Sequence, residues 1–96
     1  MSKSESYNTE LYHCKNSINY ANKMLEDITG SIKQLEIVDD DMQKYFSIGC
    51  LGVYSNKING IKQSLNNIKK GLSDDIIPSL KKQINELTNK INEMKE

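Results

Sequence analysis

The midpoint of this 96-residue chain reads SIGCLGVYSNKI, residues 47–58. Two glycines, Gly49 and Gly52, bracket the apolar pair Cys50 and Leu51 in a chain that is otherwise rich in lysine, asparagine and acidic residues. Glycine is a common residue of tight turns because it lacks a Cβ atom. We therefore predict a turn over about residues 48–52, with one structural element on each side of it.

The half of the chain before this turn has the hydrophobic period of one long helix. Its apolar residues advance in alternating steps of four and three, and only Asp39 interrupts the series. Such a series over some forty residues is typical of a coiled-coil seam. The pattern predicts a helix over about residues 5–47. Its seam would contain Tyr7, Leu11, Cys14, Ile18, Ala21, Leu25, Ile28, Ile32, Leu35, Met42 and Phe46.

The half after the turn carries a second apolar series, with steps that average about 3.6 residues, the period of a straight α-helix. It predicts a helix over about residues 53–95. Within it, residues 71–78 include Gly71 and Pro78, and a proline removes a backbone hydrogen bond and clashes with the preceding turn. A kinked helix and a break are both open, although the series continues without a phase jump. The seam would contain Ile58, Ile61, Leu65, Ile68, Leu72, Ile76, Leu80, Ile84, Leu87, Ile91 and Met94.

Two such helices make an all-α fold, an antiparallel two-helix hairpin in a single domain of residues 1–96. Residues 1–49 hold five lysines and eight acids, a net charge of −3, and residues 50–96 hold eight lysines and five acids, a net charge of +3. Opposite charges suit two segments that lie against each other. The expected facing pairs are Met42 with Ile58, Leu35 with Leu65, Ile28 with Leu72, Ile18 with Ile84, and Tyr7 with Met94.

The composition argues against several classes of function. The chain has no arginine, and its 13 lysines balance 13 acids, whereas nucleic-acid-binding proteins usually carry a basic excess. No apolar run exceeds two residues, so we expect no membrane insertion. The first ten residues, MSKSESYNTE, lack a hydrophobic run, so we expect a protein made in the cytoplasm without a cleavable signal peptide.

No set of residues has the spacing of a catalytic, cofactor or metal site. His13 and Cys14 are adjacent, so on a helix they point in different directions, and a metal needs three or four converging ligands. The acids at 39–41 lack the spacing of a calcium-binding loop. No glycine-rich phosphate loop is present. We therefore expect no enzyme activity, no cofactor and no metal.

A second row of residues lies beside the first seam. Ser17, Met24, Ser31, Val38 and Tyr45 recur every seven residues. Small and apolar residues on this line widen the face that can meet another pair of helices. One seam alone buries little apolar surface for a stable monomer. We therefore predict that Met24, Val38 and Tyr45 bind a partner.

The turn region has more large apolar side chains than two helix ends can cover. An apolar surface left over usually marks a contact. The sequence thus predicts that the turn also binds the partner, which would be another long helical hairpin or a second copy of this chain. The residues expected to take part are Tyr45, Ile48, Leu51, Val53 and Tyr54.

The tripeptide Cys50-Leu51-Gly52 carries a resemblance to a known family. With Gly52 in the matching place, it resembles the midpoint Trp-x-Gly turn of the WXG (ESAT-like) superfamily, the small helical hairpins of type VII secretion; Cys50 replaces the tryptophan. The apolar series after it resembles the small hairpins that accompany LXG-domain toxins as chaperones or targeting factors. The family's export signal, an aromatic residue followed four positions later by an acid, is absent.

The resemblance implies a non-enzymatic chaperone or targeting factor. Its partner would be the N-terminal helical domain of a type VII secreted LXG-type toxin, and the two would form a dimer built as a four-helix bundle. Secretion without a cleavable signal peptide is implied as well, with the partner supplying the missing export signal. Two alternatives stay open: a secreted homodimeric WXG-like effector, and a plain coiled-coil scaffold protein unrelated to secretion.

Overall fold

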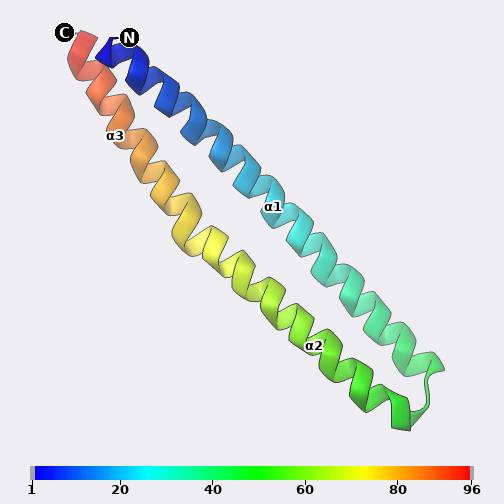
Figure 1. Cartoon of the computed structure of the whole chain (residues 1–96). Coiled ribbons are helices and arrows are strands. Elements are labelled where there is room, and N and C mark those ends of the chain that lie inside the picture. Colours follow the sequence, from blue (N-terminus) through cyan, green and yellow to red (C-terminus); the bar gives the residue numbers. More distant parts are fainter. Residues whose placement is uncertain (1, 96) are drawn as a thin grey trace.

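The computed structural model describes residues 2–95 as a rod of 71 × 17 × 15 Å (Figure 1). Helix α1 (Lys3–Tyr45) forms one arm. Helix α2 (Ile48–Gly71), the π-helical turn η1 (Leu72–Ile76) and helix α3 (Ile77–Lys95) form the other, which runs back so that the end of α3 lies beside the start of α1. This is the all-α hairpin that the sequence predicts. Met1 and Glu96, the ends of the predicted domain, lie outside the described residues.

Local hydrogen bonds satisfy several of the polar side chains of α1, which is helical over 43 residues. Ser2 caps its first turn, because the Ser2 Oγ accepts a hydrogen bond of 3.1 Å from the Glu5 N–H. Further along, the hydroxyls of Thr9, Ser17 and Thr29 each donate to the carbonyl four residues earlier. These side chains are satisfied by their own helix, which leaves the apolar stripe free to pack.

The connection between the arms lies earlier than the sequence predicts. It consists of Phe46 and Ser47, while residues 48–52 form the first turn of α2. The Ser47 carbonyl accepts hydrogen bonds of 3.0 Å from the N–H groups of Cys50 and Leu51, which begins the helix. Within the described part of the chain no glycine has a positive φ. The prediction of a glycine turn at 48–52 is therefore wrong, because extended backbone at two non-glycine residues makes the reversal.

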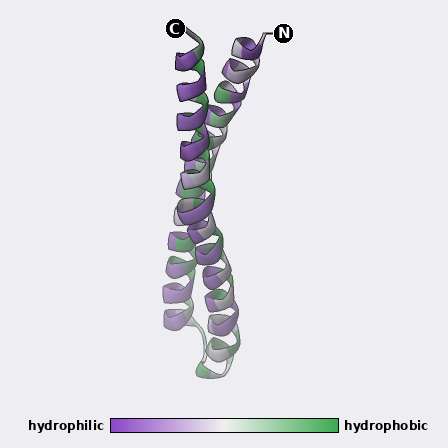
Figure 2. Ribbon diagram, turned by 90° about the vertical axis from the view of Figure 1, so that its left-hand side faces the viewer, coloured by the Kyte–Doolittle hydropathy of each residue, from purple (hydrophilic) through white to green (hydrophobic). Residues whose placement is uncertain are grey.

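The seam of α1 agrees closely with the prediction. Every predicted seam residue from Tyr7 to Met42 is buried or half-buried, and only Phe46, beyond the end of the helix, is exposed. Ala21 is the most buried, with 4% of its surface exposed, and it packs with Leu72 and Ile77. Apolar residues follow the line between the arms and gather again at the turn (Figure 2).

The seam of the second arm differs from the prediction. Through α2, the less exposed residues recur in strict steps of four and three, then η1 adds one step of five, and the regular steps resume in α3. The predicted seam residues Ile61, Ile68, Ile76 and Met94 are instead about half exposed. The observed seam contains Leu51, Ser55, Ile58, Lys62, Leu65, Lys69, Leu72, Ile77, Leu80, Ile84, Leu87 and Ile91.

The π-helical turn resolves the kink or break that residues 71–78 left open. The N–H of Ile77 donates to the Leu72 carbonyl, five residues earlier, so the arm continues without a break. The wide turn ends two residues before Pro78, whose ring would meet the carbonyl of Asp74 in a regular helix. It also contains one extra residue, which rotates Ile77 rather than Ile76 into the seam. The predicted absence of a phase jump is therefore wrong.

Three polar contacts mark the register of the arms. The Ser55 hydroxyl donates to the Asp39 carboxylate at 3.3 Å, and the Lys62 ammonium lies 3.7 Å from the Glu36 carboxylate. Near the open end, the Lys90 ammonium lies 5.6 Å from the centre of the Tyr7 ring, one helical turn before the predicted neighbour Met94. Ile28 and Leu72 pack in one cluster, in agreement with their predicted pairing.

Candidate partner-binding surface

A hairpin seam has two flanks, formed by the residues directly beside it on each arm. On each arm, the residue just before every second seam position lies on the same flank of the hairpin. Val38 of α1 and Ile61 of α2 are two of these residues, and both line one groove. Large apolar side chains fill this flank, each between 40% and 80% exposed. We call it the apolar flank: Met24, Val38, Tyr45, Tyr54, Ile61, Ile68 and Ile76.

The other flank has the opposite character. This flank is formed by the residues that directly follow the remaining seam positions of each arm. Between residues 8 and 88 all of these residues are polar or glycine. They are Asn8, Lys15, Asn22, Thr29, Glu36 and Gln43 on α1, and Gly52, Asn59, Asn66, Ser73, Lys81 and Thr88 on the second arm. A helix pair that needed only solubility would be polar on both sides, so the contrast points to a contact on the apolar flank.

The apolar flank has large apolar side chains beside seam positions that are polar. Near the turn, the seam positions of α2 include Ser55, Lys62 and Lys69. Each of the two lysines is preceded by an isoleucine, Ile61 or Ile68, which lies on the flank and is about half exposed. The half of the rod near the turn thus places large side chains outside its own core, where only another molecule can bury them.

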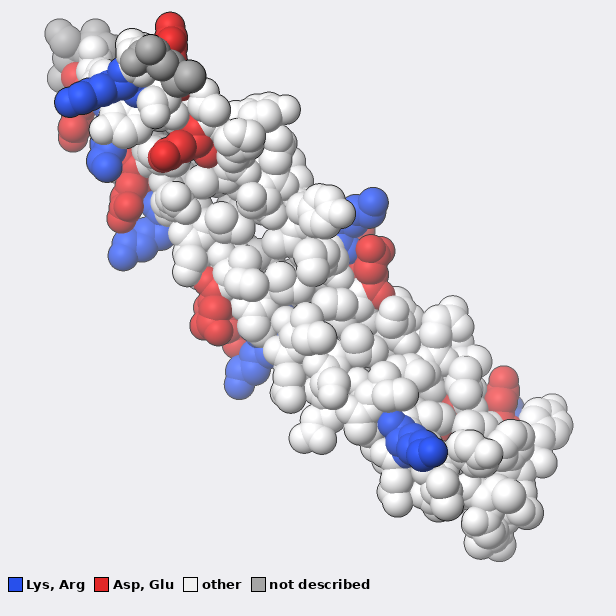
Figure 3. Space-filling view, viewed as in Figure 1, with Lys and Arg blue, Asp and Glu red and all other residues white. Residues whose placement is uncertain are grey.

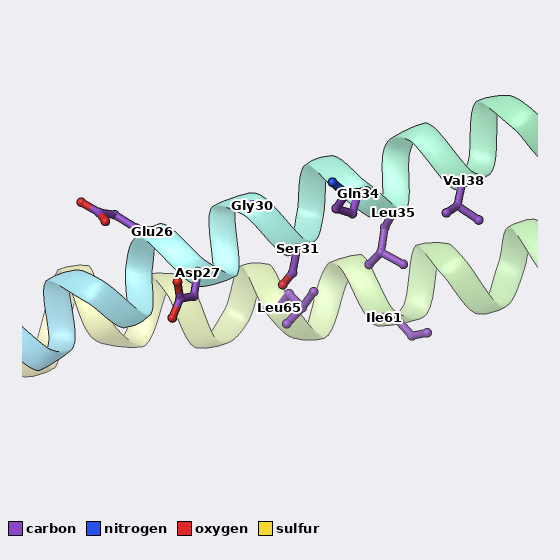
Figure 4. Close-up of a pocket in the computed structure, with 9 residues that line it drawn as sticks. All are labelled: Glu26, Asp27, Gly30, Ser31, Gln34, Leu35, Val38, Ile61 and Leu65. Atoms are coloured by element: carbon purple, nitrogen blue, oxygen red, sulfur yellow. The ribbon is translucent and has the colours of Figure 1, made fainter.

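An open groove of about 760 Å³ lies within this flank (Figure 4). Leu35, Val38, Ile61 and Leu65 provide its apolar walls, while Gly30 and Ser31 keep one side shallow. Glu26, Asp27 and Gln34 complete the lining. Such a groove between two helices accepts side chains from a third helix laid along it.

Charged groups leave much of this face free. In Figure 3 the lysines and acids lie mainly along the two edges of the rod, and an uncharged strip continues between them to the turn. Residues 45–56 contain no charged side chain at all. Depletion of charge at the centre and a polar rim are features of protein–protein interfaces.

The structure separates the predicted partner-binding residues into three groups. Met24, Val38, Tyr45 and Tyr54 lie on the apolar flank. Ile48 and Val53 are exposed at the turn, where Ile48 is 90% exposed because α2 starts beyond the end of α1, and Val53 lies on the side of α2 away from the seam. Leu51 is half-buried and continues the seam series, so it packs inside the hairpin.

The sequence missed three residues of this surface. Ile61, Ile68 and Ile76 belong to the apolar flank, although the apolar series assigned them to the seam. The signal that would have found them is the strict seven-residue spacing of Tyr54, Ile61 and Ile68, which matches that of Val38 and Tyr45 on α1. At the turn itself, Phe46 and Tyr54 meet edge to face, with ring centres 5.8 Å apart.

The tripeptide Cys50-Leu51-Gly52 lies in the first helical turn of α2 rather than in the connection. A Cβ atom on Gly52 would meet nothing within 4 Å, so packing within this chain does not require glycine there. Cys14 is buried and Cys50 is exposed, and the two thiols are unpaired. Over residues 2–95 no three His, Cys, Asp or Glu side chains converge as metal ligands would.

No helix in the described part of the chain combines the length and the apolar character needed to cross a membrane. No protein-family model, curated protein or solved structure matches the chain. What this protein does must therefore follow from its own surface, of which the apolar flank is the most distinctive part.

Proposed function

We propose that this chain is a non-enzymatic binding protein that lays its apolar flank against another long helical hairpin, so that the two form a four-helix bundle. The observation that carries the proposal is the contrast between the flanks: one holds seven large, part-exposed apolar side chains, and the other holds none among the described residues. A helical groove and row of this kind fits an amphipathic helix of a partner.

The secretion context of the proposal rests on the resemblance to the WXG superfamily. In that context the chain is a chaperone or targeting factor, and the partner is the N-terminal helical domain of a type VII secreted LXG-type toxin. The thin core supports such a role, because no side chain among the described residues is less than 2% exposed. A second hairpin would bury the part-exposed residues and supply the missing stability.

Affinity capture with matched variants tests this function. The bait would be the tagged chain, compared with Ile61→Asp on the apolar flank and Asn59→Asp on the polar flank, which carry the same change of charge. We expect a toxin with an N-terminal helical domain to be captured by the wild type and by Asn59→Asp, and captured at least tenfold less by Ile61→Asp. Purified toxin domain and purified chain should then co-elute as one complex.

Two results would contradict the proposal. One is that no protein with a long helical hairpin is captured. The other is equal capture by Ile61→Asp and Asn59→Asp, since a contact elsewhere on the rod would not distinguish the two flanks. Circular dichroism of each variant would show whether its helical content is retained.

A further inference from the structure

The apolar flank occupies only one half of the rod. It extends from Met24 and Ile76 to Tyr45 and Tyr54 at the turn, about 32 Å along the axis at 1.5 Å per residue. Toward the open end the same two rows hold Ser17 and Gln83, and then Glu10 and Lys90. A partner that buries the apolar residues must therefore present its own apolar side chains to the turn half.

The two arms of this half carry opposite charge. Residues 24–45 contain two lysines and six acids, a net charge of −4. Residues 50–76 contain four lysines and two acids, a net charge of +2. Within the hairpin these arms are neighbours, and the Glu36–Lys62 ion pair joins them. Any molecule that packs on the apolar flank meets one acidic and one basic helix side by side.

We infer that a second copy of this chain packs on the apolar flank in the absence of another partner, with both turns at the same end. A two-fold axis parallel to the rod then places α1 of each protomer beside α2 of its partner. The acidic α1 segment meets a basic α2 segment on both sides, and the two apolar halves coincide. The chain is thus complementary to itself in both charge and apolar pattern.

The opposite orientation of the two copies lacks this complementarity. With the turns at opposite ends and full overlap, each apolar half would meet the polar half of the other copy. With the copies shifted so that only the turn halves overlap, the two-fold axis would place α1 beside α1 and α2 beside α2. Segments of −4 would then face each other, as would segments of +2, and like charges across an interface are unfavourable.

This inference uses the same flank as the proposed function, but it needs only the purified chain. Homodimer and toxin complex would compete for the flank, so the second copy protects the apolar residues until a toxin domain replaces it. A chain that stays monomeric alone yet captures a toxin domain through Ile61 would overturn the inference and leave the proposed function intact.

Spin-label distances in the full chain test the orientation. Two variants are used, each with one label per chain. The first carries the label on the native, exposed Cys50 in a Cys14→Ala background. The second carries it on Asn89→Cys, with both native cysteines replaced by alanine. Cys50 lies at the turn and residue 89 lies toward the open end. Because neighbouring helices lie about 8–10 Å apart, we expect both label pairs to be separated by roughly 30 Å or less. Residue 89 lies about 9 Å from the end of α3. Copies with opposite orientation on a rod of 71 Å would therefore place the Asn89→Cys labels roughly 50 Å or more apart.

Sedimentation of Ile61→Asp and Asn59→Asp tests the surface. We expect Ile61→Asp to weaken dimerisation at least tenfold and Asn59→Asp to change it less than twofold. Ile68→Asp gives a second test on the same flank, should Ile61→Asp lose helical content. A monomeric wild type at micromolar concentration, a long distance for either label pair, or equal dimerisation of flank and control variants would overturn the inference.

Discussion

Single residues decide how close the two arms can approach. Ala21 lies where η1 meets α1, and it packs with Leu72 and Ile77, with Leu25 and Ile28 at the edge of the cluster. A small side chain leaves room there for two large ones from the facing arm. Nearer the turn, Lys62 occupies a seam position with its ammonium at the Glu36 carboxylate, so its aliphatic stem lines the seam while the charge stays near water.

Enlarging Ala21 should therefore destabilise the hairpin. We expect Ala21→Leu to lower the free energy of unfolding by about 1–3 kcal/mol, because extra methyl groups in a packed cluster force the arms apart. Urea unfolding at a single protein concentration would measure it. The matched control is Asn22→Leu, which adds the same side chain at an exposed position and should change stability by less than about 0.5 kcal/mol. Equal effects of both variants would show that Ala21 does not limit the approach of the arms.

At the scale of elements, the sequence predicted the two arms, because apolar residues that recur every 3.5 to 3.6 positions over about forty residues indicate a long α-helix. It could not place the connection, because Gly49 and Gly52 look like turn residues while the reversal uses ordinary extended backbone at Phe46 and Ser47. It also could not place the extra residue of η1. Apolar residues at both Ile76 and Ile77 fit a seam, and only the packing of a whole second arm chooses between them.

Because η1 contains one extra residue, deleting a residue within η1 should have a different effect from deleting one beyond it. In a Pro78→Ala background, removing Asp75 should convert the π-helical turn to a regular α-helical one and keep Ile77 and the later seam residues facing α1. Removing Asn85 in the same background should instead rotate Leu87 and Ile91 out of the seam by about 100°, which costs about 2–5 kcal/mol for each large side chain exposed. Thermal unfolding followed by circular dichroism compares the two. A larger loss for the Asp75 deletion would mean that η1 has a role other than adjusting the phase.

At the scale of the whole molecule, the rod is long and its core is thin. The most buried residues are spread along the length of both arms rather than gathered in one centre. Stability therefore depends on contacts added along the rod, and the apolar flank is where a partner adds them. The sequence predicted part of this surface through Met24, Val38, Tyr45 and Tyr54, but Ile61, Ile68 and Ile76 became visible only once the seam of α2 was known.

The length of the rod keeps the two cysteines apart. Cys14 lies roughly thirty residues before the end of α1, and Cys50 lies just after the turn, so about 45 Å of helix separates them. A disulfide requires Cα atoms within about 7 Å. We expect oxidised protein to contain no disulfide within one chain, as judged by peptide mass mapping under non-reducing conditions. A native protein with such a bond could not have the extended hairpin.

The charges of the two arms give the homodimer a salt dependence whose sign reports its orientation. With the turns together, each −4 segment lies beside a +2 segment of the partner, so salt should weaken the dimer. Raising NaCl from 0.1 to 1 M shortens the screening length from about 10 Å to about 3 Å, and we expect the dissociation constant to rise by about tenfold. Sedimentation equilibrium would measure it, with Lys57→Gln combined with Lys70→Gln as a control in which the dependence should flatten. If salt instead tightens the dimer, like charges face each other, and the two copies must have the opposite orientation.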